Sequence, residues 1–151
     1  MNIEVASICD AATANGPGGR LNILGAFDRI FAQFPFVIPQ FSAVFRIRYM
    51  RVEAGIHKLR LTFEDVVGKD IIPPMQSEVP FQEVAKGFDT AAMNMILNIQ
   101  RLPIKRPDKY IVRLFIDDAE FISLPLYILD QKNFDPNQPK PVAEGEEEIP
   151  N

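Results

Sequence analysis

Two stretches, SAVFRIRYM at residues 42–50 and HKLRLTFED at residues 57–65, decide the fold class of this chain. Apolar and polar residues alternate in both, and the apolar set is Phe45, Ile47, Tyr49, Leu59, Leu61 and Phe63. A period of two residues is typical of a half-buried β-strand, because successive side chains of a strand point to opposite faces. Both stretches are therefore predicted to be strands.

The short connection between these strands predicts that they form an antiparallel hairpin. Ala54 and Gly55 lie between the two stretches, and small residues suit a tight turn. The register that follows from this turn places Arg46 opposite Glu64 on the polar face of a single sheet.

A second hairpin is predicted near the end of the chain. KYIVRLFI at residues 109–116 and EFISLPLYIL at residues 120–129 flank Asp117, Asp118 and Ala119. Aspartate tolerates the backbone of a tight turn. Pro125 cannot donate a ladder hydrogen bond, so it indicates an edge strand or a bulge at that point.

The segment DTAAMNMILNIQRL, residues 89–102, has the composition of a helix but the pattern of a strand. Alanine, methionine and leucine favour helix. However, Met93, Met95, Leu97 and Ile99 share one parity while mostly polar residues occupy the other, which favours a strand.

The whole pattern predicts an all-β fold, an antiparallel β-sandwich of about eight strands that is immunoglobulin-like in style. The further strands are expected at residues 3–9, in RLNILGAFDRIFA at residues 20–32, and at residues 70–79. In the second of these, Gly25 indicates a bulge or a bend. Residues 1–131 are predicted to be a single domain, and residues 132–151 a disordered tail rich in acidic residues and proline.

Composition restricts the function classes. The formal charge is -4 and falls mostly in the tail, so the body lacks the positive field typical of proteins that bind nucleic acid. Cys9 is the only cysteine and cannot form an intramolecular disulfide. The sequence shows no signal peptide and no membrane-spanning segment, so we expect a cytoplasmic protein without a membrane partner.

The run NILGAFDRIFA at residues 22–32, followed by Pro35, Pro39, FRIRY, Gly55, His57 and LRLTFED, resembles a family of small uncharacterised bacterial proteins, a domain of unknown function. The resemblance covers residues 3–130, and NILGAFD is its most distinctive motif. It implies a compact β-rich domain and supplies no activity, ligand or site residue.

Motifs for catalysis or cofactor binding are absent from the sequence, so we expect no cofactor and assign no catalytic residue, and enzyme activity is not the leading hypothesis. NGPGGR at residues 15–20 lacks the spacing of a phosphate-binding loop. A single histidine and a single cysteine cannot form a conventional zinc site. A ligand or metal site is predicted where loops meet at one end of the sandwich. Its residues are His57, Asp10, Asp89, Asp117 and Asp118.

Residues 33–41, QFPFVIPQF, are unusually apolar for a predicted loop. Two interpretations are open: the loop closes the end of the sandwich as part of the core, or it is an exposed interface. The residues concerned are Phe34, Phe36, Val37, Ile38 and Phe41.

The leading functional hypothesis is a non-enzymatic binding or scaffolding module that binds a protein partner or a second copy through residues 33–41. The first alternative is a β-sandwich that binds a small ligand or a metal near His57 and Asp117. The second is a hydrolase-type enzyme with His57 as its base.

Overall fold

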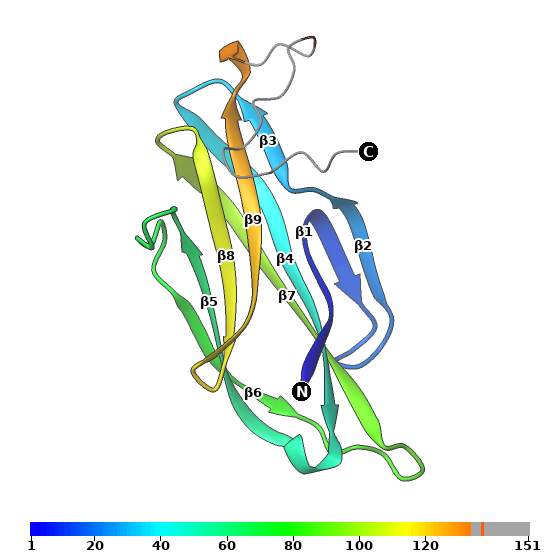
Figure 1. Ribbon diagram of the computed structural model, residues 1–151. Helices are drawn as coiled ribbons and strands as arrows, with labels where there is room; N and C mark the ends of the chain where they lie inside the picture. The colour runs from blue at the N-terminus through cyan, green and yellow to red at the C-terminus, as the bar shows by residue number, and fades with distance from the viewer. Residues whose placement is uncertain (134–136, 138–151) are drawn as a thin grey trace, which may run out of the picture.

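A computed structural model describes residues 1–133 and 137, which form two β-sheets packed on one hydrophobic core (Figure 1). The first sheet has the spatial order β2 (Leu21–Ala26), β1 (Asn2–Ala14), β4 (Phe36–Met50), β7 (Thr90–Ile104). The second has the order β3 (Arg29–Ala32), β9 (Ala119–Asp130), β8 (Asp108–Ile116), β5 (Gly55–Glu64), β6 (Met75–Phe81). The predicted all-β sandwich is confirmed, with nine strands in the described part of the chain.

The alternation in the two opening stretches identifies core residues correctly. The side chains predicted to face the core are all buried: Phe45, Ile47, Tyr49, Leu59, Leu61 and Phe63. Both sheets supply the core, and the rings of Phe41 in β4 and Phe63 in β5 lie 6.2 Å apart between the sheets. Apolar burial between two inner faces is what holds such a sandwich together.

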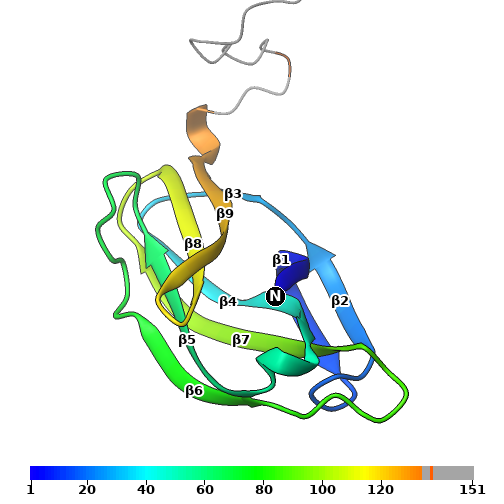
Figure 2. The same ribbon diagram turned by 60° about the horizontal axis from the view of Figure 1, so that its bottom comes forward.

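The predicted hairpin between these stretches is wrong. β4 and β5 lie in different sheets, and the short 3-10 helix η1 (Arg51–Glu53) carries the chain from one sheet to the other at the lower end of the molecule (Figure 2). Arg46 lies across from Asn94 of β7 and pairs with Glu4 at 3.1 Å, whereas Glu64 pairs with Arg113 of β8 at 2.6 Å. A connection of a few residues can cross between sheets as readily as it can form a hairpin.

The second predicted hairpin is confirmed. β8 and β9 pair in antiparallel fashion around a two-residue turn in which Asp117 has φ 49° and Asp118 has φ 67°. Two consecutive positive φ values are the mark of a type I′ turn, which matches the twist of the flanking strands. Pro125 lies where β9 pairs with β8 alone, because β3 joins β9 only from Tyr127 onward.

The strand predicted from residues 89–102 is confirmed as β7. It pairs with β4 from Thr90 to Ile104, so cross-strand pairing overrides the helix propensity of its alanine, methionine and leucine residues. The strand predicted at residues 70–79 is displaced: β6 begins at Met75, and Asp70 forms only an isolated bridge with Glu64.

The bend predicted at Gly25 lies just before the chain passes from the first sheet to the second, and the register of β2 with β1 does not shift there. β2 ends at Ala26 in the first sheet, and β3 begins at Arg29 in the second. Gly25 has φ 65°, a left-handed conformation that glycine adopts without steric cost. β3 then runs parallel to β9, so the second sheet is mixed rather than wholly antiparallel.

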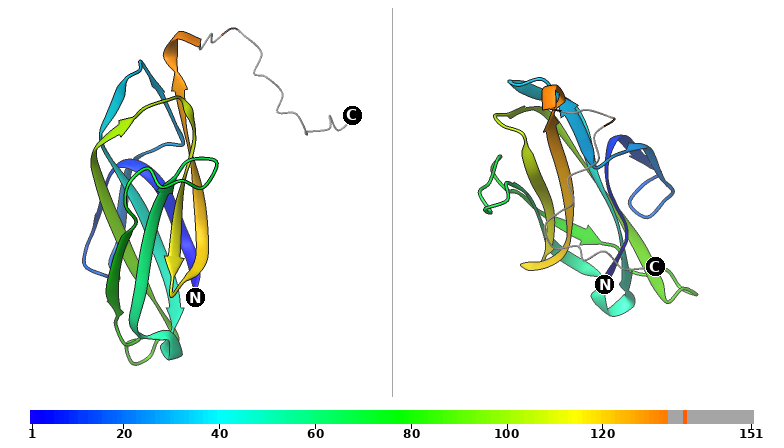
Figure 3. Two further views of the ribbon diagram at one scale, coloured as in Figure 1. Left: turned by 90° about the vertical axis from the view of Figure 1, so that its left-hand side faces the viewer. Right: turned by 45° about the horizontal axis from the view of Figure 1, so that its top comes forward.

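The two ends of the sandwich carry different loops. The lower end carries the Asp117–Asp118 turn, where the Asp117 N–H donates to the Lys58 carbonyl at 2.9 Å. The upper end carries residues 65–71, the β7–β8 connection and η2 (Gln131–Asn133), which follows β9 (Figure 3). The predicted tail begins in η2, and most of it lies outside the described residues.

Candidate functional site

His57, the only histidine, lies near the start of β5 with both ring nitrogens engaged. Nδ1 lies 2.5 Å from Asp117 Oδ2, and Nε2 lies 2.5 Å from the Glu53 carbonyl oxygen. The ring also packs on Phe81, with 4.7 Å between centroids. The structure therefore brings together two of the predicted site residues, His57 and Asp117, in a contact that leaves neither ring nitrogen open to a substrate or metal.

The surroundings of this pair favour its charged form. Burial acts to lower the pKa of His57, but the hydrogen bonds to Asp117 and to the Glu53 carbonyl outweigh it, so the pKa lies above its ordinary value. The hydrogen bond from His57, with a second from the Lys58 N–H, lowers the pKa of Asp117. The imidazolium, which donates from both nitrogens, is the form that this site stabilises.

We expect the free energy of unfolding to fall as the pH rises above about 6.5, the ordinary value for histidine. The folded state binds the His57 proton more tightly than the unfolded state, so this contribution is complete below the unfolded pKa and is lost as the pH rises through the folded pKa. Urea unfolding between about pH 5.5 and 9 measures the slope. His57→Gln should remove this component, and identical pH profiles for the two proteins would contradict the assignment.

The other predicted acids do not join His57 and Asp117. Asp118 pairs with Lys58 Nζ at 2.6 Å, Asp10 is exposed within β1, and Asp89 precedes β7. Within residues 1–133 and 137, no group of three or more His, Cys, Asp or Glu side chains is arranged to hold a metal ion. The grouping failed at Asp10 because β1 continues to Ala14, which puts this residue inside a strand instead of a loop.

Residues 33–41 belong largely to β4 and to the core. Ile38 and Phe41 are buried, which corrects the interpretation of these two residues as an exposed interface. Phe34 and Phe36 are half-buried against the core cluster and contact each other edge to face at 6.5 Å. Only Val37 of the five named residues is largely exposed, at 51%. The segment closes the upper end of the core, as the first interpretation predicted.

A different surface, the outer edge of β7, is open. β7 pairs with β4 along its full length and borders the first sheet, and no strand of the described chain pairs with its other edge. At 15 residues β7 is long for an edge strand, since strands average about 5–6 residues. Exposed edges present unpaired backbone groups that can template pairing with another chain.

The direction of the backbone groups of β7 follows from one hydrogen bond. The Asn94 N–H donates to the Pro17 carbonyl at 2.6 Å and so points away from β4. In an antiparallel ladder every second residue turns its N–H and C=O away from the partner strand. Ile96, Asn98 and Gln100 share the parity of Asn94, so their backbone groups point to the open edge.

The turn between β1 and β2 covers one part of this edge. Besides the contact of Pro17, the Gly19 carbonyl accepts from Arg46 Nη1 at 3.0 Å and from Asn94 Nδ2 at 2.8 Å. At the other end, Arg101 has φ 52° and interrupts the regular strand conformation. The open stretch of β7 is therefore residues 95–100.

An apolar groove of about 230 Å³ lies beside the open stretch. It separates β7 from β5 and β6, and β6 is itself the edge of the second sheet. The residues that line it are Leu59, Leu61, Met75, Gln76, Ser77, Val79, Met95, Ile96 and Leu97. We call this side of the sandwich, with its two strand edges and its groove, the β6–β7 side, and it is the candidate functional site.

The sequence predicts β7 as a strand, but its pattern does not show that this strand borders a sheet. One signal was available: residues 90–100 contain no charged residue, whereas edge strands are commonly protected by lysine or other charges. That signal has meaning only once the strand order is known, because a central strand is equally uncharged.

Comparison with known proteins identifies the family but no activity. A family model described as a family of unknown function, DUF6941, matches residues 4–129, nearly the range over which the NILGAFD resemblance extends. No curated protein matches the chain. No helix in the described part of the chain is both long and apolar enough to span a membrane. With all but the ends of the sandwich matched, the chain belongs to DUF6941, a family of unknown function.

Proposed function

We propose that the protein is a non-enzymatic scaffolding module that forms a two-fold dimer by pairing residues 95–100 of β7 with the same residues of a second copy. The observation that carries this proposal is the outward direction of the backbone groups of Ile96, Asn98 and Gln100, inferred from the Asn94 contact with Pro17. Pairing of such groups across an edge is a recurrent mode of protein association.

The geometry of the open stretch supports one register. An antiparallel pair centred on Asn98 places Asn98 opposite itself and Ile96 opposite Gln100, so all three residues exchange backbone hydrogen bonds with the second copy. A shift by two residues toward the start of β7 would require the Asn94 N–H, which the Pro17 carbonyl already occupies. Two four-stranded sheets would thereby become one continuous sheet.

Charge and apolar surface also support a second copy as the partner. No charged residue occurs between positions 90 and 100, so the symmetric pair brings no like charges together along the paired stretch. Met95 and Leu97 are half-buried in the groove beside the edge, and a neighbouring chain would remove further apolar area from water. Two-fold symmetry is the commonest arrangement of homo-oligomers.

Sedimentation of the full chain over a concentration series tests this proposal. We expect a monomer–dimer equilibrium, and Gln100→Pro should raise its dissociation constant by at least about tenfold, or 1.4 kcal/mol. Proline removes an N–H that points away from β4, so the β4 ladder keeps its hydrogen bonds and the monomer should stay folded.

Gln100→Ala is the matched control, because it removes the same side chain but keeps the N–H, and it should associate like the parent. Hydrogen exchange adds a direct readout: the amides of Ile96, Asn98 and Gln100 should be protected in the dimer and exchange in the monomer. A parent chain that is still monomeric at about 100 μM, which would put the free energy of dissociation below about 5.5 kcal/mol, would overturn the proposal. So would a Gln100→Pro protein that dimerises like the parent.

A further inference from the structure

The upper end of the sandwich contains a cavity that the proposed dimer does not use. Its volume of about 540 Å³ lies within the range of ligand pockets, roughly 300–1,000 Å³. Apolar residues form much of its lining, among them Ile71, Pro103 and the buried Ile104. The rest of the lining is Asp65, Val67, Lys69, Asp70, Lys105, Arg106 and Tyr110.

The acidic side chain of Asp65 in this cavity is already bound by neighbouring groups. Asp65 is buried, and its Oδ1 accepts from the N–H groups of Val67 at 3.0 Å and Lys69 at 2.9 Å, so this acid stabilises the local turn. Its Oδ2 lies 3.6 Å from Arg106 Nη2, whose side chain is 62% exposed.

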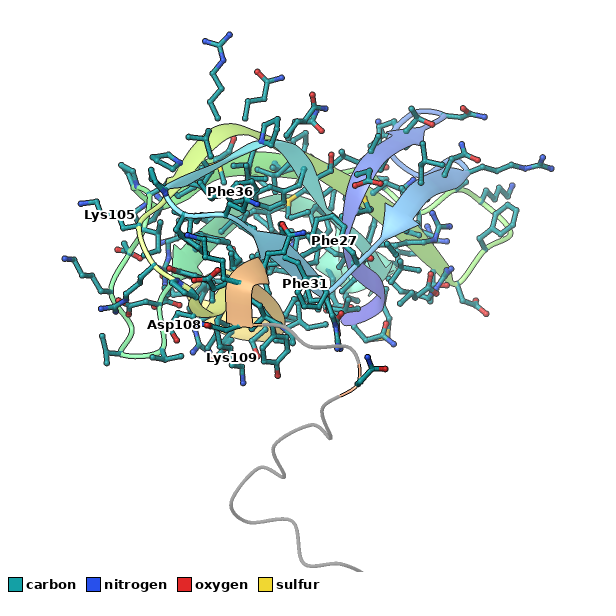
Figure 4. All side chains as sticks on the ribbon, turned by 90° about the horizontal axis from the view of Figure 1, so that it is seen from above. Phe27, Phe31, Phe36, Lys105, Asp108 and Lys109 are labelled. Atoms are coloured by element: carbon teal, nitrogen blue, oxygen red, sulfur yellow. The ribbon has the colours of Figure 1, made fainter. Side chains whose placement is uncertain are left out.

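Arg106 also lies 3.6 Å from Asp108 Oδ2, so the two lysines are the less engaged cations of the rim. Within the described chain, neither Lys69 nor Lys105 has a carboxylate at ion-pair distance, and Asp70 is the one acid of the lining that is exposed. Viewed from above, Lys105 lies at the outer margin of the upper end, away from Phe27 (Figure 4). The cavity therefore combines an apolar floor with a rim that carries more positive than negative side chains.

The chain leaves the sandwich beside this cavity. Ile128 of β9 pairs with Asp108, two residues after Arg106, and η2 ends at Asn133. Residues 144–149 follow 11 to 16 positions later, a distance along the chain that allows a reach of up to roughly 36–53 Å at about 3.3 Å per residue. The cavity lies well within this reach.

The composition of this segment complements the cavity. Residues 144–149 read EGEEEI, four glutamates followed by an isoleucine. Glutamates suit Lys69 and Lys105 at the rim, and Ile149 suits the apolar floor. A segment on the same chain binds at a high effective concentration, so even a weak contact of this kind is populated.

We propose that residues 144–149 bind in the upper cavity of their own chain, as an intramolecular ligand that an external acidic segment with an apolar end would have to displace. This inference does not rest on the proposed dimer, because the paired stretch ends at Gln100 and the cavity begins at Pro103.

Zero-length carbodiimide cross-linking of the full chain tests the contact, because it joins a lysine to a carboxylate only where the two touch. We expect Lys69 and Lys105 to be joined to residues 144–148, at least about fivefold above Lys86, an exposed lysine between β6 and β7 that serves as the control. Salt at about 1 M, where the Debye length is near 3 Å, should suppress these products. Yields at Lys69 and Lys105 that equal the yield at Lys86 would overturn the proposal.

Charge reversal provides the second measurement and guards against an unfolded variant. The first comparison sets the parent against a tail variant in which Glu146, Glu147 and Glu148 are changed to lysine, and we expect the amide NMR shifts of Ile71 and Ile104 to differ between these two proteins. When Lys69→Glu and Lys105→Glu are introduced into the parent, this difference from the tail variant should disappear. Combining both sets of changes should restore the difference. Cross-linking a mixture of unlabelled chains and chains labelled with heavy nitrogen distinguishes cross-links within one chain from cross-links between two chains. Products that join a labelled to an unlabelled chain would refute binding within one chain. The Gln100→Pro protein should give the parent result, so the two proposals fail independently.

Discussion

Phe41→Ala should lower the free energy of unfolding by about 3–5 kcal/mol, the range for truncating a buried phenylalanine. Phe41 is fully buried in β4 and its ring packs on Phe63 of β5, so it joins the two sheets across the core. Truncation removes apolar contacts and leaves a cavity between β4 and β5. These strands cannot move together to fill the cavity, because each is held by pairing within its own sheet. Urea denaturation monitored by circular dichroism measures the loss.

Val37→Ala is the control for this prediction, because Val37 lies in the same segment but is 51% exposed. Its effect should stay within about 0.5 kcal/mol, as for most surface substitutions. If the two variants lost equal stability, residues 33–41 would not form the closure of the core that the structure shows.

Gly25→Ala should cost about 1–2 kcal/mol from the left-handed backbone alone, because a side chain at φ 65° meets the following carbonyl. A second cost adds to it, since a Cβ at this position would overlap Asp10 Oδ2 and lie 2.8 Å from Asp10 Cγ, so the Asp10 side chain would have to shift. Thermal or urea unfolding of the variant gives the sum of the two costs.

Gly68→Ala separates the two costs. Gly68 has φ 85°, but nothing lies within 4 Å of a Cβ built there, so this variant should show the backbone cost only. Adding Asp10→Ala to Gly25→Ala should bring its loss close to that of Gly68→Ala. A Gly25→Ala protein no less stable than Gly68→Ala would show that Asp10 moves aside without cost.

The sequence by itself determined where most of the strands lie and which side chains of the alternating stretches face the core, although the bounds of β4 and β6 differ from those predicted. This information is local: in β4 and β5 the alternation of apolar and polar residues assigns each side chain to a face whatever strand lies next to it. The same applies to β7, where the pattern of Met93, Met95, Leu97 and Ile99 outweighed helix propensity. The turn at Asp117 and Asp118 was also readable, because only a few residue types tolerate its positive φ values.

Apart from the hairpin of β8 and β9, only the tertiary structure decided which strands pair. A cross-strand pair contributes about 0.2–1 kcal/mol, too little for single residues to select one partner strand among several with the same alternation. The predicted register therefore placed Arg46 opposite Glu64, but Arg46 forms an ion pair with Glu4. His57 contacts Asp117, which lies 60 positions later in the sequence. The open edge of β7 and the upper cavity follow from the strand order, which the summed burial of both sheets fixes and no single stretch of sequence encodes.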